Sequence, residues 1–534
     1  MEANAHVLQK DDVPWDFRRA FIRSCQEEVS TPIRGTPKGQ IPSWLRGCLL
    51  RNGPGKLVVG PDRYNHVFDG LAILQRFAID ENGGITYHSK FVRSEAYLKN
   101  TRANRIVVSE FGTVGHTDPC ASIFDRLSSY FLPTFTDNTL VNVMPVGDEY
   151  YAMTETPYLH RIDPATLDTL SHFNLRDVVA VNSATAHPLL DPADGTTYNV
   201  GSSKDGYVVV QFPAGEDALR KAQVVATVPP RSRLHPGYVH SFGLTEHYIV
   251  ILEQSLTVNI LKAMIAPYRR KPFIECMEFD RDLPVSFVVI DKATGKRKQT
   301  KYVTESFFMF HHINAFEKDG HVVVDMCVHN DYATLSGLYT DESKRPKDDR
   351  SLCAAPRRYV LPVLTESAVR EAGTNMVHLR ETTATATSCE DGTVHLQHED
   401  LRPKGSSFVC ELPRLNNAYV GKAYRFFYAV AEEAGTPTSL VKVDTEQKSC
   451  QRYGMEGWVA TEPEFVARPG ASAEDDGVVL SVFLNDADDH RVTLVILDGA
   501  RFEEVATVEF ETPSVVTVSF HGWFDCVERE QAMS

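Results

Sequence analysis

The sequence lacks three features that would each assign it to a particular class of protein. None of its ten cysteines forms a C-x-x-C pair, so no thioredoxin-like redox motif is indicated. Its apolar runs fall short of the ~18 consecutive residues of a membrane-spanning helix. Its formal net charge is -16, whereas a nucleic-acid-binding face needs a basic excess. We therefore expect no nucleic-acid partner and at most peripheral contact with a membrane.

The first residues, MEANAHVLQKDDVPWDF, also lack the basic and apolar regions of a secretory leader. Together with the cysteine usage, this predicts a reduced, cytoplasmic protein. Residues 1–40 are polar and mixed, with a short helix expected around 17–28. We expect them to form an N-terminal extension that is partly helical, followed by a single catalytic domain over residues 41–534.

Short β-rich runs separated by turn dipeptides dominate this domain. Runs such as YVVVQF, HVVVDM and VVLSVF follow dipeptides that are typical of hairpin turns. These dipeptides are Gly83-Gly84, Asp194-Gly195, Asp205-Gly206, Asp319-Gly320, Asp391-Gly392 and Asp476-Gly477. The pattern predicts a large all-β protein. By itself it leaves a propeller, a barrel and a sandwich open, because no common propeller repeat motif is present.

Two stretches break the β pattern and predict amphipathic helices, near residues 118–135 and 255–273. Within the second stretch, Arg269, Arg270 and Lys271 directly follow the apolar run VNILKAMIAPY, and apolar residues beside cations suit a membrane surface. These helices either pack onto the core or form one apolar patch that docks on a bilayer. The residues expected in that patch are Ile123, Phe124, Leu127, Phe131, Ile260, Leu261, Met264 and Ile265.

The most polar region covers residues 340–407 and contains ESKRPKDDR and ETTATATSCEDGT. Its charge run is typical of a solvated loop. Because RRYVLPV at 357–363 is strand-like, we interpret the region as a polar insertion in the domain and not as a linker.

Four histidines lie in or beside apolar or aromatic runs. A buried neutral imidazole must form a hydrogen bond or bind a metal. The four are His187 in NSATAHP, His240 in HPGYVHSFGL, His311 in FFMFHHINAF and His521 in VSFHGWF. Their spacing has no local metal-site signature, so the residues alone leave core histidines and metal ligands open. Other histidines are equally eligible on this evidence: His66, His235, His247, His312 and His329.

A set of motifs in a fixed order resembles the carotenoid cleavage oxygenase family. The motifs are LLRNGPG, HVFDG, SATAHP, GYVHSFGLTEHYIV, FHHINAFE, EDDGVVLSV and the terminal FHGWF, over about residues 30–524. Within the family, FIRSCQEEVSTPIRG and HRIDPATL are most similar to the insect carotenoid isomerooxygenases. They are also similar to the animal central-cleavage carotene oxygenases and to the retinoid isomerase of the retinal pigment epithelium. The resemblance implies a seven-bladed β-propeller with a helical cap over the active-site face.

The resemblance also implies a metal site and its surroundings. It implies that His187, His240, His311 and His521 bind one Fe(II), which suits neutral imidazoles and leaves positions open for dioxygen. It implies hydrogen bonds from ligand imidazoles to Glu155, Glu411 and Glu462. It places Phe111, Thr154, Tyr238 and Phe520 along an apolar substrate tunnel. Strand alternation adds that only one member of the His311-His312 pair should reach the metal.

The activity implied is cleavage of the central 15,15′ double bond of a carotenoid of the β-carotene, zeaxanthin or lutein class by dioxygen. The insect branch adds isomerisation, which gives 11-cis and all-trans retinoid aldehydes for a visual chromophore. Three alternatives stay open: central cleavage without isomerisation, retinoid ester isomerohydrolysis and eccentric cleavage. The resemblance further suggests a peripheral membrane surface as partner, a lipid-modifiable thiol at Cys120 and a homodimer.

Overall fold

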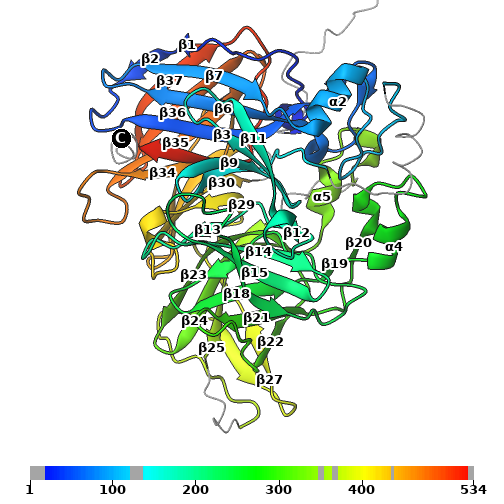
Figure 1. The fold of residues 1–534 in the computed structure, drawn as a ribbon. Coiled ribbons are helices and arrows are strands. Elements are labelled where there is room, and N and C mark those ends of the chain that lie inside the picture. Colours follow the sequence, from blue (N-terminus) through cyan, green and yellow to red (C-terminus); the bar gives the residue numbers. More distant parts are fainter. Residues whose placement is uncertain (1–17, 121–135, 347–353, 364–370, 434–437, 527–534) are drawn as a thin grey trace, which may run out of the picture.

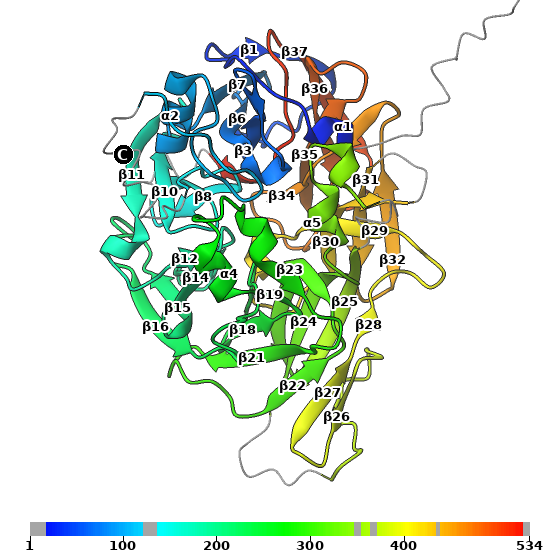
Figure 2. The same ribbon diagram turned by 90° about the vertical axis from the view of Figure 1, so that its right-hand side faces the viewer.

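Mostly antiparallel sheets surround a common centre like the blades of a propeller (Figure 1 from the side, Figure 2 along the centre). The computed structural model describes residues 18–120, 136–346, 354–363, 371–433 and 438–526. In this part of the chain seven sheets of four to six strands follow one another in sequence order, and two small two-stranded sheets are added to them. The fold is therefore the predicted seven-bladed, mostly β propeller.

The blades are formed by strands that are mostly neighbours in the sequence. The first blade contains β1 (Ile33–Arg34), β7 (Ile85–Phe91), β6 (Leu71–Ile79), β3 (Gly47–Lys56) and β38 (His521–Cys526). The second contains β11 (Thr169–Asn174), β10 (Tyr158–Ile162), β9 (Glu149–Met153) and β8 (Asn142–Val146). The third is β12 (Ser183–Ala184), β13 (Leu189–Leu190), β14 (Thr197–Ser203), β15 (Gly206–Phe212) and β16 (Gln223–Val228). The fourth is β17 (Gly243–Leu244), β18 (Tyr248–Glu253), β21 (Val285–Asp291), β22 (Lys301–Thr304), β27 (Thr393–Gln397) and β26 (Thr385–Ser388).

The remaining three blades complete the ring. The fifth blade contains β23 (Phe308–Lys318), β24 (His321–His329), β25 (Ala354–Pro362) and β28 (Glu399–Asp400). The sixth contains β29 (Val409–Arg414), β30 (Phe426–Glu432), β31 (Ser439–Asp444) and β32 (Ser449–Tyr453). The last is β2 (Thr36–Gly39), β37 (Glu504–Glu511), β36 (Arg491–Asp498), β35 (Gly477–Asn485), β33 (Trp458–Ala460) and β34 (Glu464–Ala467). The small sheets pair β4 (Val58–Val59) with β5 (Asp62–Arg63), and β19 (Leu256–Val258) with β20 (Met277–Phe279).

The two ends of the chain close the ring. β3, near the N-terminus, pairs with β38 near the C-terminus, with Asn52 opposite His521, and β2 pairs with β37. Apolar faces of neighbouring blades bury one another: Phe77, Val143 and Leu480 come from three different blades and belong to one core cluster. Burial of such side chains is the main stabilising term for this architecture.

The α-helices of the described residues are short. They are α1 (Arg18–Phe21), α2 (Glu95–Ala103), α4 (Ile260–Ile265) and α5 (Ala333–Gly337). Of these, α2, α4 and α5 lie on one face of the propeller (Figure 2). Only α1 falls in the stretch 17–28, and α4 covers six residues of the stretch 255–273, which also contains β19. None of the described helices is long and apolar enough to cross a membrane.

The turns follow the sequence prediction at most positions. Asp319 and Gly320 both adopt positive φ, 44° and 75°, between β23 and β24, as a type I′ hairpin turn requires. Gly206 joins β14 to β15, and Gly392 joins β26 to β27, also with positive φ. Gly477 differs: it begins β35 and is not among the positive-φ glycines.

The boundaries differ from the expected ones. β1 and β2, at residues 33–39, each extend a blade, so the propeller begins before residue 41. The polar stretch 340–407 also supplies propeller strands, because β25 pairs with β24 along its whole length and β27 pairs in parallel with β22. At β1 and β2 the physical reason is that an edge strand needs backbone hydrogen bonds on one side only, so polar segments suffice. In contrast, β25 and β27 are interior strands, and each buries part of its side chains within the polar stretch.

Replacement of Gly47 tests the contact between β3 and β38 that closes the ring. The φ of Gly47 is +134°, and a Cβ there would lie 2.0 Å from the carbonyl oxygen of Asp525 on β38. We expect Gly47→Ala to lower the free energy of unfolding by about 1–3 kcal/mol or more, measured by chemical denaturation. Gly470→Ala is the control, because Gly470 has φ of +76° with nothing within 4 Å of a Cβ. Equal losses in both variants would contradict the closure contact.

Candidate metal centre

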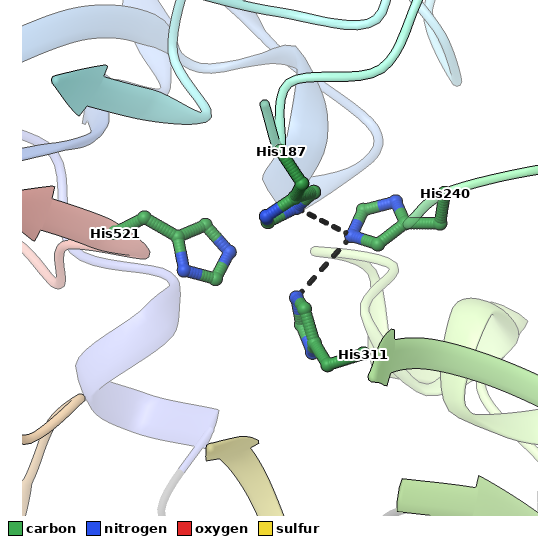
Figure 3. Close-up of side chains that lie close together, drawn as sticks. All are labelled: His187, His240, His311 and His521. Carbon is green, nitrogen blue, oxygen red and sulfur yellow. Dashed lines mark hydrogen bonds between the residues drawn. The ribbon is translucent and has the colours of Figure 1, made fainter. Parts of the chain in front are cut away.

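Four imidazoles from four blades meet at the centre of the propeller (Figure 3). One ligand atom from each of His187, His240, His311 and His521 lies within 4.8 Å of the others. The Nε2 atom of His240 is 2.9 Å from that of His187 and 3.3 Å from that of His311. The histidines expected to form a metal site are therefore brought together.

Each histidine is positioned by a different part of the fold. His187 lies between β12 and β13, and His240 precedes β17. His311 is in β23, next to a bulge, and His521 begins β38, where its partner across the ladder is Asn52. Since consecutive strand residues face opposite ways, His312 points elsewhere and its Nδ1 pairs with the Ser241 hydroxyl at 2.9 Å.

Three of the imidazoles donate a hydrogen bond from Nδ1 to a glutamate. The pairs are His240–Glu155 at 2.5 Å, His311–Glu411 at 2.6 Å and His521–Glu462 at 2.7 Å. A proton held on Nδ1 leaves the lone pair on Nε2, which is the atom that faces the other histidines. The glutamates expected to bond to ligand imidazoles thus do so, whereas in the described residues no carboxylate bonds to His187.

Buried arginines stabilise the glutamate charges. Arg51, which is fully buried, donates to Glu462 at 2.5 Å, and Arg414 forms an ion pair with the neighbouring Glu464. Burial raises the pKa of Glu462, but His521, Arg414 and Arg51 outweigh burial and lower it to about 2. Glu462 is therefore ionised at neutral pH and can accept a hydrogen bond from Nδ1–H of His521.

The pKa values of three of the imidazoles are lowered, which favours their neutral form. Burial lowers the pKa of His521 to about 4, although Glu462 opposes this shift. Burial, followed by the neighbouring histidines, lowers the pKa of His187 well below its ordinary value. Burial also lowers the pKa of His240, against the effect of Glu155. Neutral nitrogen donors of this kind are what first-row transition metals bind, so the donor set fits a divalent metal.

A large cavity of about 1210 Å³ opens onto the cluster. Phe111, Thr154, Tyr238 and Phe520, the expected tunnel residues, all line it. Tyr238 donates its hydroxyl proton to Glu155 at 2.7 Å, and burial raises its pKa well above the ordinary value, so it stays a neutral donor. Thr154 and Phe520 are 8% and 7% exposed, so this part of the wall is buried inside the protein.

Several contributors escaped prediction from the sequence. Phe310 packs its ring 4.9 Å from that of His240, and Phe68 packs against Phe520 at 5.4 Å. His329 pairs through Nε2 with the second oxygen of Glu411 at 2.8 Å. Arg51 stands in the LLRNGPG motif and His329 among the eligible histidines, but only long-range contacts reveal their roles.

Comparison with known proteins identifies the family. The family model described as retinal pigment epithelial membrane protein matches residues 22–525. The chain belongs to this carotenoid oxygenase family. It is similar to human beta,beta-carotene 15,15′-dioxygenase, with 40% identity over 94% of each chain. It is similar to carotenoid isomerooxygenases of Drosophila melanogaster (37%, covering 94% of this chain and 92% of that one) and Galleria mellonella (38%, 94% and 96%).

The fold of this carotenoid oxygenase family member also matches solved structures. Cobalt-substituted Synechocystis ACO superposes with a TM-score of 0.74 at 24% identity, covering 96% of this chain and 98% of that chain. The family shown is a family of dioxygenases and isomerooxygenases by the names of these relatives. The identities to the vertebrate and insect relatives are too similar to separate the two branches.

Replacement of Glu411 tests the role of the carboxylates. Glu411→Gln keeps the size but removes the charge that His311 and His329 both contact. We expect the affinity for a divalent metal to fall by about 10–100-fold, measured by metal analysis after dialysis against graded metal buffers. Glu253→Gln is the control, because Glu253 is a buried strand glutamate outside the cluster that bonds to Tyr207. Unchanged affinity in Glu411→Gln would contradict this role.

Proposed function

We propose that the protein is an iron(II)-dependent dioxygenase that cleaves the central 15,15′ double bond of a carotenoid to two retinoid aldehydes. The observation that carries the proposal is a large, mostly apolar cavity that opens onto the four-histidine cluster. The printed names of the human, Drosophila and Galleria relatives support it.

The cavity suits a long polyene. Its volume of about 1210 Å³ exceeds the ~300–1,000 Å³ of ordinary small-molecule pockets. A carotenoid has few polar groups, so its binding depends on burial of apolar surface against rings such as Phe111 and Phe520. Because His240, His311 and His521 line the same cavity, a bound chain would pass beside the imidazoles.

His187, His240, His311 and His521 would hold the iron through their Nε2 atoms. Ferrous iron bound there supplies activation of dioxygen, which side chains alone do not provide. The reaction breaks one carbon–carbon double bond and adds one oxygen atom to each carbon, so both atoms of dioxygen enter the products. The glutamates keep the imidazoles oriented, and the aromatic wall positions the polyene and excludes water.

We further propose that cleavage is coupled to isomerisation, giving one 11-cis and one all-trans aldehyde. The insect relatives are named isomerooxygenases, which supports this finer activity. Central cleavage alone, eccentric cleavage and ester isomerohydrolysis are the competing reactions, and each leaves a different product. Thr154 and Tyr238 are two of the polar groups of the cavity wall, and we propose that they face charge developing along the polyene.

Isomer-resolving chromatography of products from β-carotene or zeaxanthin tests the function. Iron-loaded protein under air is expected to give 11-cis and all-trans retinoid aldehydes, and His240→Ala is expected to give neither. All-trans aldehyde alone would contradict the isomerisation and leave a central-cleavage dioxygenase. An apocarotenoid with an ionone would indicate eccentric cleavage, and turnover of a retinyl ester without dioxygen would indicate an isomerohydrolase.

We also propose that the enzyme is cytoplasmic and docks on a membrane through the face that carries α4. Leu261, Met264, Ile265 and Tyr268 are 56%, 64%, 41% and 58% exposed. Exposed cations follow at Arg269, as interfacial helices require. Ile260 is half-buried. Ile123, Phe124, Leu127 and Phe131 lie outside the described residues, and Cys120 has an exposed thiol whose acylation stays a prediction.

Met264 also lines the cavity, together with Ile260 and Pro267, so the cavity opens beside this apolar surface. The substrate could then enter from the hydrocarbon phase without crossing water. In liposome flotation with anionic vesicles, the double variant Leu261→Glu, Met264→Glu is expected to remain in the soluble fraction while the wild type floats. Leu170→Glu, at an exposed leucine on β11, is the control and should float. Flotation of all three would contradict the docking surface.

A further inference from the structure

A second group of metal-ligating side chains lies outside the four-histidine centre. Asp137, His160 and His172 place one ligand atom each within 4.8 Å of the others. They belong to the loop before β8, to β10 and to β11. They share no residue with the central cluster or with the lining of the large cavity. The proposed dioxygenase reaction uses none of them.

The sheet register brings the two histidines together. His160 and His172 are direct partners across the antiparallel ladder of β10 and β11, so their side chains leave the same face of the sheet. Their facing nitrogens, Nε2 of His160 and Nδ1 of His172, are 3.3 Å apart. His160 is buried, whereas the side chain of His172 is 42% exposed at the edge of the blade. One side of the cluster is thus open to solvent.

Asp137 is fixed independently of the histidines. Its carboxylate accepts the backbone N–H groups of Glu95 and Ala96 at 2.6 and 3.0 Å, at the start of α2. The Oδ2 atom of Asp137, which accepts from Glu95, lies 3.5 Å from Nε2 of His160 and 3.7 Å from Nδ1 of His172. Those distances are too long for charge-assisted hydrogen bonds, which are about 2.7–2.9 Å. The carboxylate is therefore close to both imidazoles without a short hydrogen bond to either of them.

The spacing matches a tetrahedral cation. Ligands about 2.0–2.1 Å from a four-coordinate zinc ion are about 3.3 Å from one another, whereas adjacent ligands of an octahedral ion at that bond length are about 2.9 Å apart. The three measured separations are 3.3, 3.5 and 3.7 Å. Two imidazoles, one carboxylate and an open fourth position form a donor set that Zn²⁺ accepts.

The surroundings set the histidine tautomer that such a site needs. Nδ1 of His160 lies 3.1 Å from the hydroxyl oxygen of Thr139. With that nitrogen donating to the hydroxyl, the lone pair remains on Nε2, which faces the cluster. The exposed ring of His172 can carry its proton on Nε2 toward solvent and present Nδ1 inward.

We propose that Asp137, His160 and His172 bind a divalent cation of the zinc class, with solvent as the fourth ligand. The ion joins the edge strand β11 to the loop that caps α2, which lie side by side on the outside of the propeller (Figure 2). Thr136, next to Asp137, donates its hydroxyl to Glu110 in the cavity wall. The ion is therefore placed to stabilise the support of that wall and takes no part in the reaction.

Titration of the iron-loaded, full-length protein with Zn²⁺ tests the site. Wild type is expected to bind one Zn²⁺ per chain by calorimetry without losing iron, and His172→Ala is expected to bind it at least tenfold more weakly. His395→Ala, at an exposed histidine on β27, is the matched control and should behave as wild type. Replacement of Zn²⁺ by Co²⁺ should give the visible absorption bands of a four-coordinate ion in wild type and not in His172→Ala.

Three results would overturn the proposal. These are no zinc uptake by wild type, equal affinity in His172→Ala, and uptake matched by an equal loss of iron, which would place the zinc in the central cluster. Melting temperatures without added zinc show whether the variants are folded. If His172→Ala melts lower than wild type, His172→Gln keeps a polar side chain of similar length at the edge position and is judged by the same titration.

Discussion

The hydrogen bonds from imidazole Nδ1 to glutamate are the interactions on which the centre depends. Imidazoles whose Nε2 atoms lie as close as 2.9 Å repel one another through their lone pairs in the absence of a proton or a metal. Groups on the Nδ1 side of the rings must therefore hold the imidazoles in this orientation. The short bonds to Glu155, Glu411 and Glu462 impose it on three of them.

The buried glutamates that orient the imidazoles need partners of their own for their negative charge. A carboxylate as buried as Glu462 is costly unless it is paired and hydrogen-bonded. Arg51 on β3 supplies the pairing, and it can do so because β3 lies beside β38, the strand of His521. Closure of the ring and assembly of the centre are thus linked: the strand pairing that joins the two ends of the chain also brings Arg51, Glu462 and His521 together.

Much of this was predictable from local sequence, and the reason is physical. Turn pairs such as Asp319-Gly320 need a positive φ that few residues adopt, so they mark hairpins. A histidine within an aromatic strand, such as His311, signals a buried polar group that requires a partner. Motif resemblance then sorted His311 from His312 and selected the three glutamates. The contacts of Arg51 and His329 could not be predicted, because their partners lie 411 and 82 residues away and only the folded ring brings them close.

Domain boundaries and helices were predicted least well, again for a physical reason. Edge strands such as β1 and β2 need only one row of backbone hydrogen bonds and no apolar alternation, so polar residues at 33–39 gave no strand signal. The apolar run around α4 predicted a longer helix than the six residues observed. Its apolar content also did not reveal whether the helix faces the core or the outside.

The position of α4 links the cavity to its surroundings. A polyene dissolves poorly in water, so a tunnel whose mouth faced water would receive substrate only at the low aqueous concentration of that substrate. Met264, an exposed apolar side chain of α4, lines the same cavity as His240 and His311, and Leu261 on the same helix is also exposed. An exposed apolar surface in that place costs solubility and adds nothing to the core. Such a surface would suit the proposed membrane docking, in which the mouth of the cavity meets a hydrocarbon phase and the histidine cluster lies inside the propeller.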